Sequence, residues 1–212
     1  MSAPEDQEPR IYVVDDDADV RDAIAFLLES DGLSARVFAH PGALLGEISV
    51  HSRGCLVLDV RLPGMDGLQL LEALHARGVT MPVVFISGHG DIPLAVRAVQ
   101  AGALDFLEKP FRDQVLLEKI RTGLTMDARQ WAQARERALM DERLEQLTPR
   151  ETEVMEGMLA GKLNKLIADD LGVSVRTVEV HRAHVLEKIG ARNSPDMVRM
   201  VLSSSRYRDW RA

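Results

Sequence analysis

The fold of this chain is decided by one stretch, Cys55-Leu56-Val57-Leu58-Asp59-Val60-Arg61-Leu62-Pro63-Gly64-Met65-Asp66-Gly67. Its first four residues are apolar, and a run this short and β-branched is typical of a buried strand rather than a helix. Asp59 stands where that strand ends, and the Pro-Gly and Asp-Gly pairs behind it indicate a tight loop. Because α/β proteins place chemistry at the carboxyl ends of parallel strands, Asp59 is a candidate functional residue. Taken alone, it could equally well cap the loop.

Composition is that of a globular protein without a membrane segment. The chain has 212 residues, 46% of them hydrophobic, which is enough for one large or two small domains. No run approaches the ~18 apolar residues of a membrane span, and the acidic N-terminal stretch does not resemble a secretory signal. The single cysteine, Cys55, excludes an internal disulfide and a multi-cysteine metal site, and we expect it to be a buried apolar residue. We therefore expect a cytoplasmic protein.

Charge is distributed unevenly along the chain, whose net charge is −7. Residues 147–212 contain eleven Lys and Arg against nine Asp and Glu, a net charge of +2. The remaining residues therefore carry −9. An acidic first part and a mildly basic second part indicate two domains with different partners, although this small basic excess does not by itself identify a nucleic-acid binder.

Strands and helices alternate through the first 122 residues. We predict strands at 11–14, 35–38, 55–58, 83–86 and 104–107 from their short apolar runs. We predict a helix after each of them, at about 20–28, 41–48, 68–74, 91–102 and 113–122, with Asp91 capping the fourth. Five such alternations predict a doubly wound parallel sheet with helices on both faces.

Chemically active side chains follow the predicted strands. They are Asp15, Asp16, Asp59, Ser87 and Lys109. Because the carboxyl ends of parallel strands meet at one edge of a sheet, these groups are expected to converge. Close carboxylates repel one another and favour a hard divalent cation, and Mg²⁺ suits a site with few carboxylates. Each residue has a plainer interpretation, as a loop cap or a solvated charge, but their joint occurrence at strand ends favours a phosphoryl-transfer site.

Four motifs in this part resemble the receiver domains of bacterial two-component response regulators. They are VVDDD at 13–17, LDVRLPGMDG at 58–67, FISGHGD at 85–91 and FLEKPF at 106–111. The resemblance covers about residues 8–123 and implies a flavodoxin-like, five-stranded doubly wound sheet. It also implies that Asp59 is the phosphoacceptor and that Mg²⁺ is the cofactor. The implied metal ligands are Asp15, Asp16, Asp59 and the backbone carbonyl of Arg61.

The same resemblance assigns the remaining residues of the site. Ser87 is the switch hydroxyl, Lys109 pairs with the phosphoryl group, and Phe106 is the switch aromatic. Arg61 and His89 lie where side chains of the family tune the lifetime of the phosphoryl group. Asp17 has no family role in the site, and we interpret it as a loop or helix-start residue.

Residues 124–146 are predicted to form a helical linker. The stretch lacks Gly and Pro and is rich in Ala, Arg, Gln, Glu and Leu. Its narrow apolar stripe, formed by Trp131, Ala134, Ala138 and Leu139 and followed by Leu144 and Leu147, is short and rich in alanine. We favour a solvated spacer that extends the preceding helix, and the alternative is a coiled seam or a docking surface.

Four short helices are predicted after the linker. Thr148-Pro149-Arg150-Glu151 is a capping box that starts the first, Asn164 is expected to cap the second, and Ser174 the third. Ser194 and Pro195 open the fourth. The second and third helices, joined by a turn containing glycine, indicate a helix-turn-helix, which supports DNA binding without establishing it.

Residues 147–205 resemble the C-terminal output domain of LuxR, NarL and FixJ regulators, through LTPRETEV and GKLNKLIADDLGVSVRTVEVHRAHVLEKIG. The resemblance makes the third helix the recognition helix in the major groove. Base contacts are implied for Glu179, Val180 and Ala183. Side chains suited to phosphate contacts are Lys165, Arg176, Thr177, Arg182 and Lys188. His181 and His184 are not expected to bind metal, because no further ligand accompanies their i, i+3 spacing.

Together the resemblances imply a phosphorylation-activated transcriptional regulator closest to the FixJ branch. The expected domains are a disordered tail at 1–8, a receiver at 9–123, the helical linker at 124–146 and an all-α, four-helix DNA-binding domain at 147–212. A sensor histidine kinase, double-stranded promoter DNA and a second copy of the phosphorylated chain are the expected partners, with RNA polymerase a further candidate. No membrane partner is expected.

Two alternatives accompany this interpretation. One is an orphan regulator of the same architecture that is gated independently of phosphorylation. The other is a small phosphatase with an aspartyl nucleophile. It is disfavoured because haloacid-dehalogenase-type phosphatases need a second acid two residues after the nucleophile, where Arg61 stands here. We therefore expect no enzymatic activity beyond the domain's own phosphoryl transfer and dephosphorylation.

Overall fold

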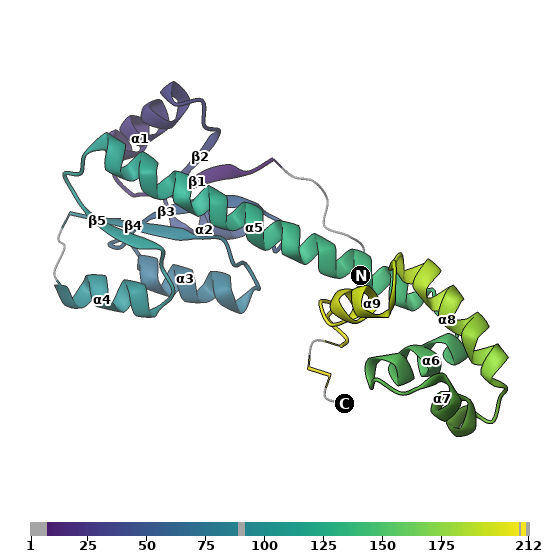
Figure 1. Ribbon diagram of the computed structural model, residues 1–212. Helices are drawn as coiled ribbons and strands as arrows, with labels where there is room; N and C mark the ends of the chain where they lie inside the picture. The colour runs from purple at the N-terminus through teal and green to yellow at the C-terminus, as the bar shows by residue number, and fades with distance from the viewer. Residues whose placement is uncertain (1–7, 89–91, 208, 211–212) are drawn as a thin grey trace. The chain divides into compact units, whose positions relative to one another are not determined.

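The computed structural model describes residues 8–88, 92–207 and 209–210, and the chain divides into two compact units after Trp131. The first unit is α/β and the second is helical (Figure 1). The predicted helix cap Asp91 and the predicted tuning residue His89 lie outside the described residues. So does most of the predicted tail. Among the described residues, no helix is both long enough and apolar enough to span a membrane.

The first unit contains the five predicted strands. They are β1 (Arg10–Val14), β2 (Ala35–Phe38), β3 (Gly54–Asp59), β4 (Val83–Ser87) and β5 (Asp105–Glu108). The helices that alternate with them are α1 (Ala18–Ser30), α2 (Pro41–Glu47), α3 (Gly67–Ala76), α4 (Ile92–Gln100) and α5 (Asp113–Glu145). Asp17 caps α1 by accepting a hydrogen bond from the Asp19 amide, as its interpretation as a helix-start residue required.

All strand pairs in the sheet are parallel, in the order β2-β1-β3-β4-β5. The doubly wound prediction is therefore confirmed. From β1 the chain first moves outward to β2 and then returns to place β3 on the other side of β1. This reversal creates a switch point between the carboxyl ends of β1 and β3, which is the place where such sheets bind ligands.

The central strands are apolar throughout because both faces of the sheet are covered. Side chains that alternate along each strand enter two separate cores. In β3, Leu56 and Leu58 lie in one core with residues of α2, α3 and α4, whereas Cys55 and Val57 lie in the other core with residues of α1 and α5. Cys55 is a free thiol and is fully buried, which confirms its predicted place in the core.

The predicted linker is helical and continues the last helix of the sheet domain without a break, as α5. Its beginning is not simply solvated. The Arg53 guanidinium lies 4.3 Å from the centre of the Trp131 ring and 3.2 Å from the buried Asp127 carboxylate. Along the apolar stripe Leu139 is exposed, whereas Leu144 is buried in the second unit together with Met140, which the stripe did not include.

The second unit contains the four predicted helices. They are α6 (Pro149–Leu159), α7 (Asn164–Leu171), α8 (Val175–Ile189) and α9 (Ser194–Val201). The Thr148–Glu151 capping box and the Ser174 cap are confirmed. The Asn164 cap was wrong: Leu163 has the extended backbone of a cap, and Asn164 is already helical. Leucine has no acceptor, so α7 begins without a side-chain cap.

Candidate functional site

The three predicted carboxylates meet at the switch point of the sheet. Asp15 follows β1, Asp59 ends β3, and Asp16 stands beside them at the surface. Oxygen atoms of the three lie within 4.8 Å of one another. Asp15 is fully buried and Asp59 is 6% exposed. Because two of these negative charges are withdrawn from water, the site requires compensating positive charge.

Lys109 supplies part of that compensation. Its ammonium lies 2.6 Å from Asp15 Oδ2 and 3.7 Å from Asp59 Oδ2. The backbone amide of Lys109 donates to the carbonyl of Ser87 at 2.8 Å, so the end of β4 fixes the segment that carries the lysine. The arrangement therefore gathers side chains from three strand ends, as the sequence predicted.

Asp59 has an oxygen available for chemistry. Its Oδ1 atom is buried and has no hydrogen-bond partner among the described residues. Burial raises the pKa of Asp59, Lys109 opposes that rise, and the Asp15 charge adds to it. The net result is a carboxylate with a raised pKa and an unpaired oxygen. A hard cation with oxygen ligands matches this oxygen and the surrounding negative charge.

Gly67 is required where α3 approaches the site. A Cβ atom at this position would lie 2.4 Å from the carbonyl oxygen of Asp59 and 2.9 Å from Phe85 Cε1. The Gly67 amide donates to Val60 at 2.9 Å, and Asp66 forms a capping box with Gln69. The Asp-Gly pair thus starts α3 directly against the loop that follows Asp59.

The two predicted switch residues lie on neighbouring strands. Ser87 is fully buried at the end of β4, and Phe106 is partly buried in β5, against the core on the α4 side. Arg61 is exposed and lines an open groove with Asp16, Asp66 and Arg97. Its side chain therefore stands at the rim of the acidic cluster.

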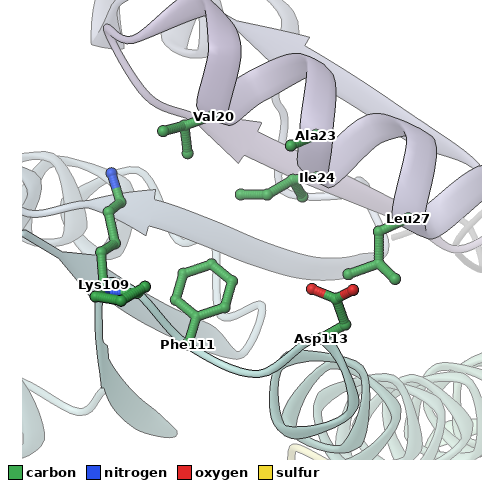
Figure 2. A pocket seen from close by; sticks show the side chains of 8 residues that line it. Val20, Ala23, Ile24, Leu27, Lys109, Phe111 and Asp113 are labelled. Carbon is green, nitrogen blue, oxygen red and sulfur yellow. The ribbon is translucent and has the colours of Figure 1, made fainter.

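An apolar hollow of about 420 Å³ lies on the other side of Lys109. Figure 2 shows Val20, Ile24 and Leu27 of α1 facing Phe111, with Lys109 and Asp113 at its borders. The hollow therefore borders Lys109, the residue that pairs with Asp15 and Asp59.

The second unit presents a helix-turn-helix. Gly172 ends α7 in the left-handed conformation, with φ of 65°, and two residues later Ser174 caps α8. Val178, Val185 and Ile189 bury one side of α8. The opposite side is exposed, which leaves a complete helix face open to a groove of DNA.

Comparison with known families identifies both units. Residues 11–121 match the model of the response regulator receiver domain, and residues 145–201 match that of bacterial regulatory proteins of the luxR family. The chain is a response regulator. A receiver domain followed by a luxR-type domain identifies it as a transcriptional regulator of a two-component system.

Relatives of this response regulator align with it along most of its length. FixJ of Azorhizobium caulinodans is 47% identical, covering 91% of each chain. DctR of Rhodobacter capsulatus, a regulator of C4-dicarboxylate transport, is 46% identical over 90% of this chain and 98% of its own. Among solved structures, StyR has a TM-score of 0.84 at 39% identity, covering 92% of this chain and 98% of its own. Full-length FixJ from B. japonicum has a TM-score of 0.56 at 40% identity, covering 93% and 98%.

The predicted base-contact residues of the response regulator share the open face of α8. Glu179, Val180 and Ala183 are all exposed, and Val180 is 48% exposed although it is apolar. An apolar side chain kept in water at this position suits contact with a thymine methyl group.

The predicted phosphate contacts divide into two groups. Lys165 and Arg176 are exposed. The other three already have intramolecular partners. Thr177 lies 2.8 Å from Ser174 Oγ in the helix cap, Arg182 donates to Ser194 Oγ at 2.8 Å, and Lys188 lies 2.6 Å from Glu151 Oε2.

Sequence reasoning missed the contacts that hold α8 in the response regulator. Burial alone would raise the pKa of Glu151, but hydrogen bonds from Lys188 and Thr148 outweigh it and lower that pKa to about 2. The Arg143 side chain donates to the carbonyl of Ile189 at 2.8 Å, at the end of α8. The capping-box motif in the sequence pointed to Glu151. Nothing in the sequence indicated that Glu151 pairs with Lys188, which lies 37 residues further along the chain.

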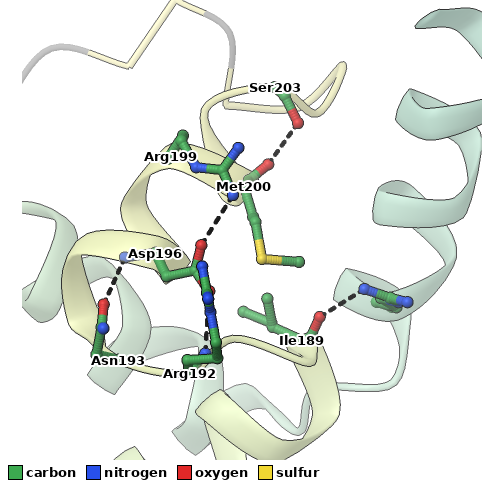
Figure 3. A network of polar contacts seen from close by, with 8 residues as sticks. Ile189, Arg192, Asn193, Asp196, Arg199, Met200 and Ser203 are labelled. Carbon is green, nitrogen blue, oxygen red and sulfur yellow. Dashed lines mark hydrogen bonds and ion pairs between the residues drawn. The ribbon is translucent and has the colours of Figure 1, made fainter.

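Figure 3 shows how α9 is held beside this end of α8. The Asp196 carboxylate accepts from Arg199 at 2.8 Å and from Arg192 at 3.2 Å, while the Asp196 backbone amide donates to the Oδ1 atom of the cap residue Asn193 at 2.9 Å. The hydrogen bond from Arg199, followed by those from Arg192, lowers the pKa of Asp196. The two arginines are largely exposed, so solvent screens these ion pairs and they contribute little to the stability of the domain.

Proposed function

We propose that this response regulator is activated by phosphorylation of Asp59 and then binds promoter DNA as a dimer. The observation that supports the proposal most strongly is the state of Asp59. It is a buried carboxylate at the switch point, with one oxygen unpaired and an ammonium 3.7 Å from the other. Most buried carboxylate oxygens in proteins have a hydrogen-bond partner, so an unpaired one supports a role in chemistry.

The proposed reaction transfers a phosphoryl group from a phosphohistidine of a sensor kinase. An Asp59 oxygen attacks phosphorus, the new P–O bond forms, and the P–N bond breaks with its electron pair left on the imidazole. Lys109 holds Asp15 and Asp59 in place and offers its charge to the phosphoryl oxygens.

The acidic cluster fits Mg²⁺, which Asp15, Asp16 and Asp59 would hold, with the backbone carbonyl of Arg61 as the predicted fourth ligand. When bound, this ion neutralises negative charge on the carboxylates and on the phosphoryl oxygens. The carboxylates themselves position the ion, and Lys109 limits their repulsion in its absence.

The switch is proposed to run through Ser87 and Phe106 to the surface of α4. Phosphoryl oxygens on Asp59 would attract the Ser87 hydroxyl, and Phe106 lies on the next strand. On α4, Ile92 is 81% exposed, Val96 48% and Val99 57%. An apolar strip of this kind suits a second copy of the chain. Moving an equilibrium from 1:99 to 99:1 requires about 5.5 kcal/mol of preference for the active state.

The proposed output is sequence-specific binding through α8. Glu179, Val180 and Ala183 are proposed to contact bases, and Lys165 and Arg176 the phosphates. Thr177 and Arg182 remain predicted phosphate contacts that must first exchange their present partners. Lys188 was also predicted to contact a phosphate, but its pairing with the buried Glu151 favours a structural role. Two half-sites are expected, because a two-fold dimer reads a two-fold operator.

The remaining features of the proposal concern partners and activity. A sensor histidine kinase is the proposed donor, and RNA polymerase is a further predicted partner. The protein is proposed to act in the cytoplasm and to catalyse only its own phosphorylation and dephosphorylation.

Incorporation of labelled phosphate from acetyl phosphate with Mg²⁺ tests the proposal. Wild type should be labelled and Asp59→Asn should not. Asp17→Asn is the matched control, since it removes a neighbouring charge from the same acidic run while asparagine still caps α1. Equal labelling of Asp59→Asn would remove Asp59 as the acceptor. Phosphate-independent dimerisation would favour an orphan regulator instead.

A further inference from the structure

Three potential metal ligands meet between α6 and α8 in the second unit. They are Glu151 of α6 and His181 and His184 of α8, and their ligand atoms lie within 4.8 Å of one another. The two histidines are one helical turn apart, so they share a side of α8. Glu151, 30 residues earlier in the chain, supplies the third ligand that the spacing of the histidines alone lacks.

The ligand atoms of Glu151, His181 and His184 are oriented so that an ion could bind between them. Glu151 is 4% exposed, and its Oε2 atom accepts from Lys188 at 2.6 Å and from the Thr148 amide at 2.8 Å. Its other oxygen, Oε1, faces His184 Nδ1 at 3.6 Å. Nδ1 of His181 is buried and has no hydrogen-bond partner among the described residues. The cluster therefore contains an oriented carboxylate oxygen and two imidazoles, one of them with an unsatisfied nitrogen.

We propose that Glu151, His181 and His184 form a binding site for a divalent ion of the zinc class, joining α6 to the recognition helix. Two imidazoles and one carboxylate are a ligand set that zinc accepts, with water completing the coordination. The site differs in kind from the oxygen-only cluster at Asp59, which suits Mg²⁺.

Binding requires only a small contraction of the cluster. Ligand atoms in a tetrahedral zinc site are about 3.3 Å apart, given bond lengths near 2.0–2.1 Å. The side chain of His184 is 52% exposed and so has room to turn toward Glu151. The ion would use Oε1, while Lys188 stays on Oε2 and fixes the orientation of the carboxylate. The Lys188 charge lowers the affinity for the ion without occupying the ligand atom.

Calorimetric titration of the full-length chain with zinc tests the site, in excess Mg²⁺ so that the acidic cluster of the receiver is occupied. Wild type should bind one zinc ion. His184→Gln should bind zinc at least about tenfold more weakly, because loss of a residue that only hydrogen-bonds to a metal ligand already lowers metal affinity about 10–100-fold. His51→Gln, an exposed histidine of the first unit, is the matched control and should bind zinc as wild type does.

A second measurement separates loss of the ligand from loss of the fold. Zinc should raise the melting temperature of the helical unit in wild type, because an ion that binds only the folded state stabilises it. The shift should be absent in both His184→Gln and His181→Gln, whose melting temperatures without zinc stay close to that of wild type. Equal zinc binding by wild type and His184→Gln, or an equal loss in His51→Gln, would overturn the proposal.

Discussion

Lys188 is predicted to stabilise the output domain rather than to contact DNA, and Lys188→Met separates the two roles. Its ammonium lies 2.6 Å from a carboxylate that is 5% exposed. Breaking a buried ion pair by removing one partner costs about 3–5 kcal/mol. The drop in the Glu151 pKa from 4.5 to about 2 corresponds to about 3 kcal/mol, of which Thr148 supplies a share. Because Lys188 is 33% exposed, solvent screening reduces the loss, and we expect about 2 kcal/mol.

Urea unfolding of the full-length chain measures this loss. In a Trp131→Phe background, Trp210 is the remaining tryptophan and its fluorescence reports on the second unit. Lys188→Met should lower the midpoint with an unchanged slope. Lys165→Met, at an exposed lysine of α7, should change stability by less than about 0.5 kcal/mol.

The two substitutions should have the opposite effects on DNA binding. Lys165→Met should weaken binding to every duplex and flatten the dependence on salt, as the loss of a phosphate contact does. Lys188→Met should leave the salt dependence unchanged. A stable Lys188→Met protein with a flattened salt dependence would refute the structural role and restore Lys188 to the phosphate contacts.

Three further predictions concern the receiver domain. Burial raises the pKa of Cys55 from 9.0 to about 12, so its contribution to stability is complete below pH 9 and is lost as the pH rises from 9 to 12. Near pH ~8 a thiol reagent should therefore label the native chain far more slowly than the unfolded one, and rapid native labelling would contradict this. Gly67→Ala should lower the free energy of unfolding by about 1–3 kcal/mol and slow phosphate incorporation, because the new Cβ would clash with Asp59 and Phe85. Unchanged thermal unfolding and unchanged labelling would contradict the close approach of α3 to Asp59. Val99→Glu should leave phosphate incorporation intact while preventing the phosphate-dependent increase in mass seen by light scattering, and normal dimerisation would exclude the α4 surface.

The architecture of the first unit could be predicted because local and global signals agree. The apolar runs of β1, β3 and β4 require burial on both faces, and that requirement alone indicates a sheet covered by helices. Once the strands are parallel, their carboxyl ends must lie at one edge, so Asp15, Asp59 and Lys109 converge whatever the details of packing.

Features that depend on packing between distant segments were not visible in the sequence. Both Leu139 and Met140 are apolar, and only the neighbouring helices decide that Met140 is the buried one. Asn164 is a better cap than Leu163 by propensity, yet the chain begins α7 one residue earlier. The pairing of Glu151 with Lys188 joins two different helices, so no local sequence pattern predicts it.

DNA binding measured with and without phosphorylation of Asp59 tests the central claim most directly. Wild type and Asp59→Asn would each be treated with acetyl phosphate and Mg²⁺, and the binding of promoter DNA would be followed by fluorescence anisotropy. Wild type should bind more tightly after treatment, and Asp59→Asn should bind equally weakly before and after it. Binding by wild type that does not respond to the phosphoryl donor, or an equal response in Asp59→Asn, would contradict the account.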